Sequence, residues 1–121
     1  MSLATITERL RRAELNAGRA PGSVSLIAVS KVQPPERVAE VLEQGQRVFG
    51  ENRVQEAQSR WPDFQARYQG IELHLIGPLQ TNKARAAVEM FDAIHTLDRL
   101  KLAQVLARLA QERGACPEVF I

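Results

Sequence analysis

The sequence predicts an α/β fold built around a parallel β-sheet. Apolar runs too short for helices begin near residues 26, 47, 72, 93 and 118, so their spacings are 21, 25, 21 and 25 residues. Helical patterns of apolar side chains fill the intervals between these runs. Alternation of strand and helix at this period is typical of parallel strands joined by right-handed crossovers. A doubly wound sheet and a (β/α) barrel both satisfy the pattern.

The composition is that of one soluble domain. The 121 residues are 45% hydrophobic and 25% charged, with a formal net charge of +2, and a chain of this length can bury a core. We find no apolar run of membrane-spanning length and no secretory signal, so no membrane partner is expected. The single cysteine, Cys116, fits a reducing compartment, which predicts a cytoplasmic protein. The basic residues are scattered, so nucleic acid is not the expected partner.

The first elements follow from apolar periodicity. Residues 3–17 carry apolar side chains at three- and four-residue steps, which predicts an amphipathic helix. Residues 26–30 form the first expected strand. Pro34-Pro35 begins a second helix, because the first helical turn does not need the missing N–H, and Gly45 ends it. Residues 47–49 are the second expected strand.

Candidate N-cap side chains mark the remaining helices. Asn52 begins a capping-box pattern for a helix that ends at about Trp61, before Pro62. Asn82 and Asp98 are the candidate caps of two further helices. The strands that lie between or after these helices are expected at 73–76, 93–95 and 118–121.

Lys31 is the sharpest candidate for chemistry. Ligands of parallel α/β folds bind at the carboxyl ends of the strands, and Lys31 follows the first strand. Alternation places it on one face with Ile27 and Val29, so it is expected to continue a buried row. An enclosed lysine loses its charge readily, and the neutral amine can form a Schiff base with an aldehyde. The alternative is a lysine that extends from the strand end into water.

Other polar residues near strand ends leave two interpretations open. Lys83 and Arg85 lie in the first turn of an expected helix, where a cation is unfavourable unless an anion binds nearby. The alternative is a solvated helix end. Asn52 is either a cap alone or also a ligand contact. His74 and His95 have no third ligand at metal spacing, so we interpret them as hydrogen-bonded core histidines and predict no metal site.

Four segments resemble a known family. In chain order, LIAVSKVQPPERV, FGENRVQEA, HLIGPLQTNKA and IHTLDR resemble the pyridoxal phosphate homeostasis proteins over residues 26–99. The resemblance implies a (β/α) TIM-type barrel similar to the N-terminal barrel of alanine racemase. A complete barrel needs about 250 residues. Residues 1–121 are therefore interpreted as a single domain that forms the N-terminal half of such a barrel, with about five parallel strands.

The resemblance also implies a function and a site. It implies a protein of intracellular vitamin B6 homeostasis that holds pyridoxal 5′-phosphate as a Schiff base on Lys31 and passes it on, with enzymes that need this cofactor as candidate partners. Asn52, Asn82 and Lys83 are the implied cofactor contacts, and no catalytic residue is implied. The alternative is a racemase-type enzyme. Racemisation by the alanine racemase route needs a second base opposite the lysine, usually a tyrosine. The single tyrosine, Tyr68, precedes the third strand and is therefore expected at the other end of the barrel from Lys31.

A second alternative is a half-barrel whose site is incomplete. The resemblance places the phosphate-binding loop, and the arginine that faces the pyridine nitrogen, in the C-terminal half. We therefore expect this chain to bind pyridoxal phosphate weakly and a complete barrel to bind it well. Complete barrels of the family are expected to be largely monomeric, whereas a half-barrel with an uncovered apolar edge is expected to self-associate.

Overall fold

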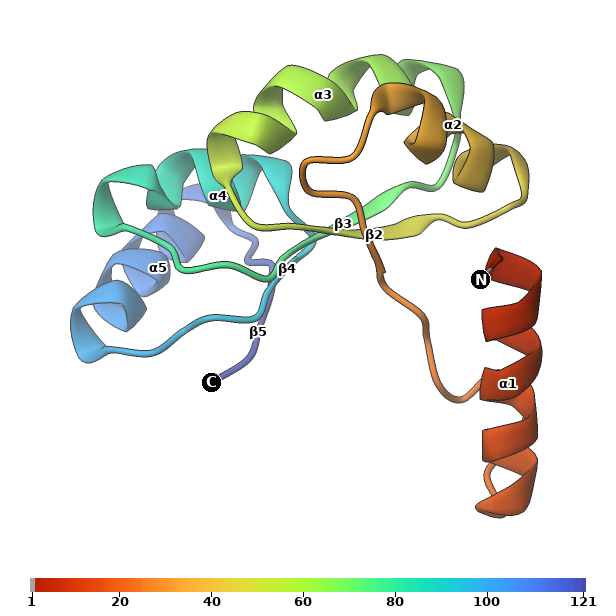
Figure 1. The fold of residues 1–121 in the computed structure, drawn as a ribbon. Helices are drawn as coiled ribbons and strands as arrows, with labels where there is room; N and C mark the ends of the chain where they lie inside the picture. The colour runs from red at the N-terminus through yellow and green to blue at the C-terminus, as the bar shows by residue number, and fades with distance from the viewer. Residues whose placement is uncertain (1) are drawn as a thin grey trace.

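Five parallel strands form one sheet in the order β1-β2-β3-β4-β5, and a helix joins each strand to the next (Figure 1). The structure is a computed structural model that describes residues 2–121. Its elements are α1 (Leu3–Asn16), β1 (Ala28–Val29), α2 (Pro35–Glu43), β2 (Val48–Glu51), α3 (Val54–Arg67), β3 (Glu72–Leu75), η1 (Thr81–Lys83), α4 (Ala84–Met90), β4 (Ala93–Ile94), α5 (Leu100–Arg113) and β5 (Glu118–Val119).

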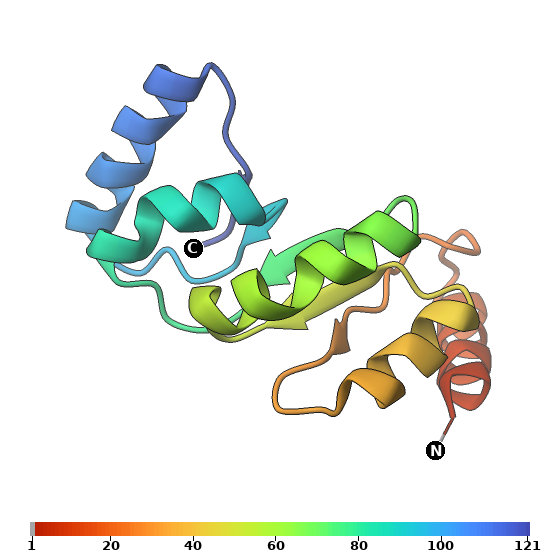
Figure 2. The same cartoon turned by 90° about the horizontal axis from the view of Figure 1, so that it is seen from above.

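The strand order decides between the two folds that the pattern left open. A doubly wound sheet changes direction at a switch point and carries helices on both faces. Here the order is sequential, and Figures 1 and 2 show α2, α3, α4 and α5 along one face of the sheet. Sequential parallel strands with their helices on the outside are the arrangement of a (β/α) barrel. The predicted fold class, a barrel-type sheet of five parallel strands, is confirmed.

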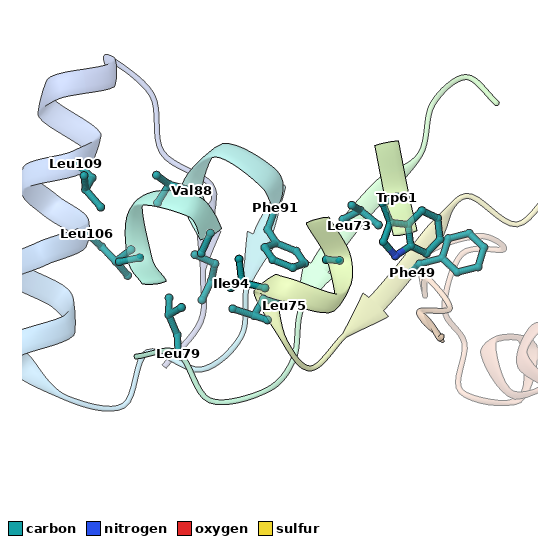
Figure 3. Packing of buried hydrophobic residues seen from close by; sticks show 14 of the residues in the cluster. Phe49, Trp61, Leu73, Leu75, Leu79, Val88, Phe91, Ile94, Leu106 and Leu109 are labelled. Atoms are coloured by element: carbon teal, nitrogen blue, oxygen red, sulfur yellow. The ribbon is translucent and has the colours of Figure 1, made fainter. Parts of the chain in front are cut away.

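The hydrophobic core lies between the sheet and these four helices (Figure 3). Phe49, Leu73, Leu75 and Ile94 are almost fully buried and come from three successive strands. Trp61 of α3 is also fully buried, and its ring centroid lies 4.8 Å from that of Phe49. Tilted aromatic pairs at this separation pack favourably beyond the area they bury. Since side chains alternate along a strand, the residues between these point to the opposite face.

That opposite face corresponds to the interior of a barrel, and we call it the inner face. The register pairs Val29 with Gly50, and Gly50 with His74. Ile27 and Ile76 meet above Gly50, where an added Cβ would lie 3.1 Å and 3.0 Å from their side chains. Val29 remains 49% exposed on this face. The inner face therefore carries apolar side chains that the helices α2–α5 do not cover.

The three predicted helix caps are corrected by the structure. Arg53, the residue after Asn52, is the N-cap of α3, and Arg99, the residue after Asp98, is the N-cap of α5. Asn82 lies within η1. For α3 the reason is that Arg53 is itself extended, at φ −131° and ψ 135°, so the helix begins one residue later than the capping-box pattern predicts.

Pro62 does not end α3, which continues to Arg67. A proline inside a helix removes one backbone hydrogen bond and crowds the preceding turn. Here Pro62 faces solvent, while Trp61 and Phe64 on either side of it are buried in the core. We attribute the continued helix to the burial of these two aromatic side chains, which favours an uninterrupted helical path.

Glu14 ties α1, which stands apart from the other helices in Figure 1, to the chain before β1. Glu14 is 2% exposed. It accepts hydrogen bonds from Arg11 Nη1 at 2.7 Å, from the N–H of Val24 at 2.8 Å and from the N–H of Gly22 at 3.1 Å. The bond from Arg11, with help from the two backbone donors, lowers the pKa of Glu14 to about 2 although burial raises it.

This lowered pKa predicts a pH-dependent contribution to stability. Because the folded-state pKa lies below the ordinary value of 4.5, the contribution is complete above that value and is lost as the pH falls toward about 2. Glu14→Gln should therefore be less stable than the parent chain at pH 7, and the difference should shrink as urea unfolding is repeated at lower pH. Glu8→Gln is the control, because Glu8 and its partner Arg12 are both exposed. A difference for Glu14→Gln that stays constant with pH would contradict the assignment.

Within residues 2–121, no helix is both long enough and apolar enough to cross a membrane.

Candidate functional site

The carboxyl ends of the first four strands are joined into one continuous edge. Ser30 Oγ donates to Glu51 Oε1 at 2.5 Å, which links the ends of β1 and β2. The backbone of Asn52 packs so closely on Gly77, after β3, that an added Cβ there would lie 2.3 Å from the Asn52 carbonyl oxygen. Thr96 Oγ1, after β4, donates to the carbonyl of Gly77 at 2.7 Å. The loops with the predicted site residues are thus held beside one another.

Lys31 lies in the turn at the end of β1 with its side chain exposed. The prediction that it continues a buried row with Ile27 and Val29 was wrong, because that row faces the inner face, where Val29 is itself half-exposed. The turn is closed by a hydrogen bond from the N–H of Gln33 to the carbonyl of Ser30 at 3.2 Å. Because Lys31 is exposed in this turn, its amine is accessible to a ligand rather than enclosed.

A pocket of about 490 Å³ lies between the loops after β2 and β3. This volume falls within the usual range of small-molecule sites. Asn52 and Lys83 line the pocket together with Arg53, whereas Asn82 and Lys31 are not among its lining residues. The structure thus brings two of the four predicted site residues into one pocket. Two cations at its wall favour an anionic ligand.

Arg85, which the sequence placed beside Lys83 as a candidate anion contact, is not among the lining residues of the pocket. Its guanidinium forms an ion pair with Glu112 of α5 at 3.2 Å. Arg99 holds the loop after β3 from the other side, because its Nη2 donates to the carbonyl of Leu79 at 2.6 Å. Lys83 remains beside the pocket as the N-cap residue of α4.

Two histidines on the inner face form a hydrogen-bonded chain. His74 Nδ1 and His95 Nε2 are 2.8 Å apart, and His74 Nε2 is 2.9 Å from Glu72 Oε2. His95 also stacks on Phe120, with ring centroids 4.8 Å apart. Desolvation, together with the neighbouring His74, lowers the pKa of His95, and Glu118 opposes this.

The prediction of hydrogen-bonded histidines is confirmed, but they do not belong to the core between the sheet and the helices. Both lie on the inner face, where the side chain of His74 is 12% exposed and His95 is partly buried. The alternation with Leu73 and Leu75, which face the helices, was the signal that places His74 on the other side of the sheet. Among the described residues, no group of three or more His, Cys, Asp or Glu side chains is arranged to hold a metal ion.

Tyr68 lies at the opposite end of the sheet from Lys31, as the sequence predicted. It follows α3 and precedes β3, and its hydroxyl donates to Glu43 Oε1 at 2.5 Å. This hydrogen bond is the main cause that raises the pKa of Tyr68. The position excludes Tyr68 as a second base acting on a ligand held by Lys31.

Comparisons with known proteins extend this description. No family model matches the chain. The pyridoxal phosphate homeostasis protein of Vibrio alginolyticus is 48% identical over 103 residues, which are 84% of this chain and 44% of that protein. The protein of the same name from Escherichia coli K12 is 44% identical over 115 residues, which are 94% of this chain and 48% of that protein.

Solved structures show the same likeness. PipY of Synechococcus elongatus, solved with pyridoxal phosphate bound, superposes with a TM-score of 0.77 and 47% identity, covering 94% of this chain and 52% of PipY. An unknown protein from Bifidobacterium adolescentis superposes with a TM-score of 0.86 and 31% identity, covering 96% of this chain and 51% of that one. The chain is therefore a homologue of the pyridoxal phosphate homeostasis proteins and spans about half the length of the curated relatives it matches.

Proposed function

We propose that this chain forms part of a pyridoxal phosphate-binding protein of vitamin B6 homeostasis, with the cofactor held as a Schiff base on Lys31. The observation that carries the proposal is the accessible amine of Lys31 at the carboxyl end of β1, on the edge shared by the four strand ends. The homologues named for pyridoxal phosphate homeostasis, and the likeness to PipY with this ligand bound, support it.

The side chains at this edge suit the aldehyde and the phosphate group of pyridoxal phosphate. The amine of Lys31 would add to the aldehyde carbon, and loss of one water molecule would leave the carbon–nitrogen double bond. Arg53 and Lys83 at the pocket wall would attract the phosphate. Asn52 and Asn82 are proposed as amide contacts to the same ligand. Bound pyridoxal phosphate supplies a reactive aldehyde, and its attachment to one lysine would keep it from other amines.

We propose a carrier or regulator in the cytoplasm, which would transfer the cofactor to enzymes that require it, instead of a racemase. The support for this choice is the position of Tyr68. Its hydroxyl is bound to Glu43 at the amino-terminal end of the sheet, so the described residues do not place a tyrosine opposite Lys31. Transfer also requires that the ligand can leave, which agrees with an exposed Lys31.

An absorbance titration tests the proposal. Addition of pyridoxal phosphate to the chain should produce the visible band of a protonated imine, with a weak apparent affinity because the chain spans only about half the length of its relatives. Pyridoxal, which has the aldehyde but lacks the phosphate, should give the band only at higher concentration if the cations contribute. Failure of pyridoxal phosphate to produce any band above that of free amino acid amines would contradict the proposed function.

A further inference from the structure

A buried polar cluster supports the turn that contains Lys31. Glu51, the last residue of β2, is 1% exposed, and its Oε1 accepts the hydrogen bond from Ser30 Oγ. Nη1 of Arg60, on α3, lies 3.9 Å from the same oxygen. A buried carboxylate is unfavourable unless it is paired and hydrogen-bonded. Ser30 supplies the hydrogen bond and Arg60 supplies the opposite charge. None of these three residues is among the proposed contacts to the cofactor.

Arg60 also holds the backbone on both sides of Lys31 and Val32. Its Nη1 donates to the carbonyl of Ser30 at 2.6 Å, and its Nη2 donates to the carbonyl of Gln33. The N–H of Gln33 donates to that same Ser30 carbonyl, so Lys31 and Val32 are the two central residues of a closed turn. A guanidinium with two separate donors can fix both ends of such a turn, which a single ammonium cannot do as well.

The turn is strained at Val32, whose φ angle is 51°. The left-handed region is unfavourable for side chains with a Cβ, and most of all for β-branched ones. The side chain of Val32 is 82% exposed, so it gains nothing from packing in this conformation. The hydrogen bonds from Arg60 to the flanking carbonyls, together with the backbone bond that closes the turn, maintain this conformation. Strained backbone of this kind tends to occur at functional sites.

We infer that Arg60 and Glu51 are positioning residues for Lys31. The buried carboxylate of Glu51 lies 3.9 Å from Nη1 of Arg60 and balances its charge, and Arg60 keeps the turn of residues 30–33 in its strained conformation. The conformation of the turn then sets where the amine of Lys31 stands relative to the edge formed by the strand ends. This inference rests on the proposed function for the role of Lys31, but the link between Arg60 and Val32 is independent of any ligand.

The first test uses no cofactor. In Arg60→Met, NMR chemical shifts and scalar couplings of Val32 should show that its φ angle has moved to the negative region. Arg47→Met is the matched control, because Arg47 also donates to backbone carbonyls, those of Leu42, Gln46 and Gln69, at the other end of the sheet. It should lower stability without moving Val32. A Val32 that keeps its positive φ in Arg60→Met would overturn the inference.

The second test measures the amine. Pyridoxal phosphate is added, the adducts are reduced with borohydride, and the yield at Lys31 is compared with that at Lys101 as an internal reference. Arg60→Met should lower the yield at Lys31 by about tenfold, equivalent to about 1.4 kcal/mol. Val32→Gly in the same background should restore most of it, because glycine adopts a positive φ without strain. A loss below about twofold, or no restoration by glycine, would overturn the inference.

The two tests separate this inference from the proposed function. If the parent chain gives no adduct at Lys31 while Val32 still moves in Arg60→Met, the proposed function fails and the link between Arg60 and the turn stands. In that case the positioning role for the amine falls with the function. If the parent chain gives the adduct and Val32 does not respond to Arg60→Met, the function stands and the inference fails.

Discussion

Replacing Lys31 by methionine is expected to abolish the absorbance band that pyridoxal phosphate induces in this chain. Methionine is close in length to lysine but has no amine, so it cannot add to the aldehyde. Because Lys31 is exposed at the end of β1, the substitution should leave the unfolding free energy within about 0.5 kcal/mol of the parent value. Loss of the band without loss of stability would assign the signal to this side chain.

The other two lysines provide matched controls. Lys101 is exposed in the first turn of α5 and is not among the lining residues of the pocket, so Lys101→Met should leave the band unchanged. Lys83→Met removes one cation from the pocket and should weaken the apparent affinity by less than about tenfold, the usual range for one exposed charge pair. A band that survives in Lys31→Met, or one that disappears in Lys101→Met, would contradict the proposed role of Lys31.

The second large effect is expected for Gly77→Ala. An alanine Cβ at this position would lie 2.3 Å from the carbonyl oxygen of Asn52 and 2.9 Å from its Cα, and both are backbone atoms that cannot rotate away. The loops after β2 and β3 must then separate. Overpacking of this kind costs about 1–3 kcal/mol and sometimes more. Urea unfolding should show the loss, and a changed pocket beside Asn52 should weaken pyridoxal phosphate binding as well.

Gly50→Ala gives a graded comparison with Gly77→Ala. The Cβ at Gly50 would meet only the side chains of Ile76 and Ile27, at 3.0 Å and 3.1 Å, and these can shift by a few tenths of an ångström. Gly50→Ala should therefore cost clearly less than Gly77→Ala. Equal stability of Gly77→Ala and the parent chain would show that the two loops do not approach each other as the structure describes.

The fold class and the order of the elements were predictable because they depend on local signals. Short apolar runs separated by helical periodicity predicted all five strands. The starts of α1 and α2 were also predicted, whereas those of α3, α4 and α5 were not. Asn52 has the right side chain for a cap, but Arg53 is also extended and takes that position. The backbone of Asn52 instead packs on Gly77 after β3, a contact that is not local in the sequence.

The positions of the candidate residues at the strand ends were predictable, and their environment was not. Lys31 and Asn52 are found at neighbouring strand ends because the carboxyl ends of parallel strands share one edge. Whether Lys31 is enclosed depends on what covers the inner face, which strand alternation does not reveal. Arg60 lies thirty residues from Ser30 in the sequence, and an arginine on an amphipathic helix carries no signal that it will hold a distant turn. The strain at Val32 is equally invisible before the backbone is known.

Reduction of the pyridoxal phosphate adduct with borohydride, followed by peptide mass mapping, tests the central claim most directly. The chain has three lysines, Lys31, Lys83 and Lys101, so each outcome identifies one amine. We predict that the reduced adduct is found predominantly on Lys31. An adduct on Lys83, on Lys101 or on the N-terminal amine with Lys31 unmodified, or no adduct on any of them, would contradict the account of Lys31 as the residue that holds pyridoxal phosphate.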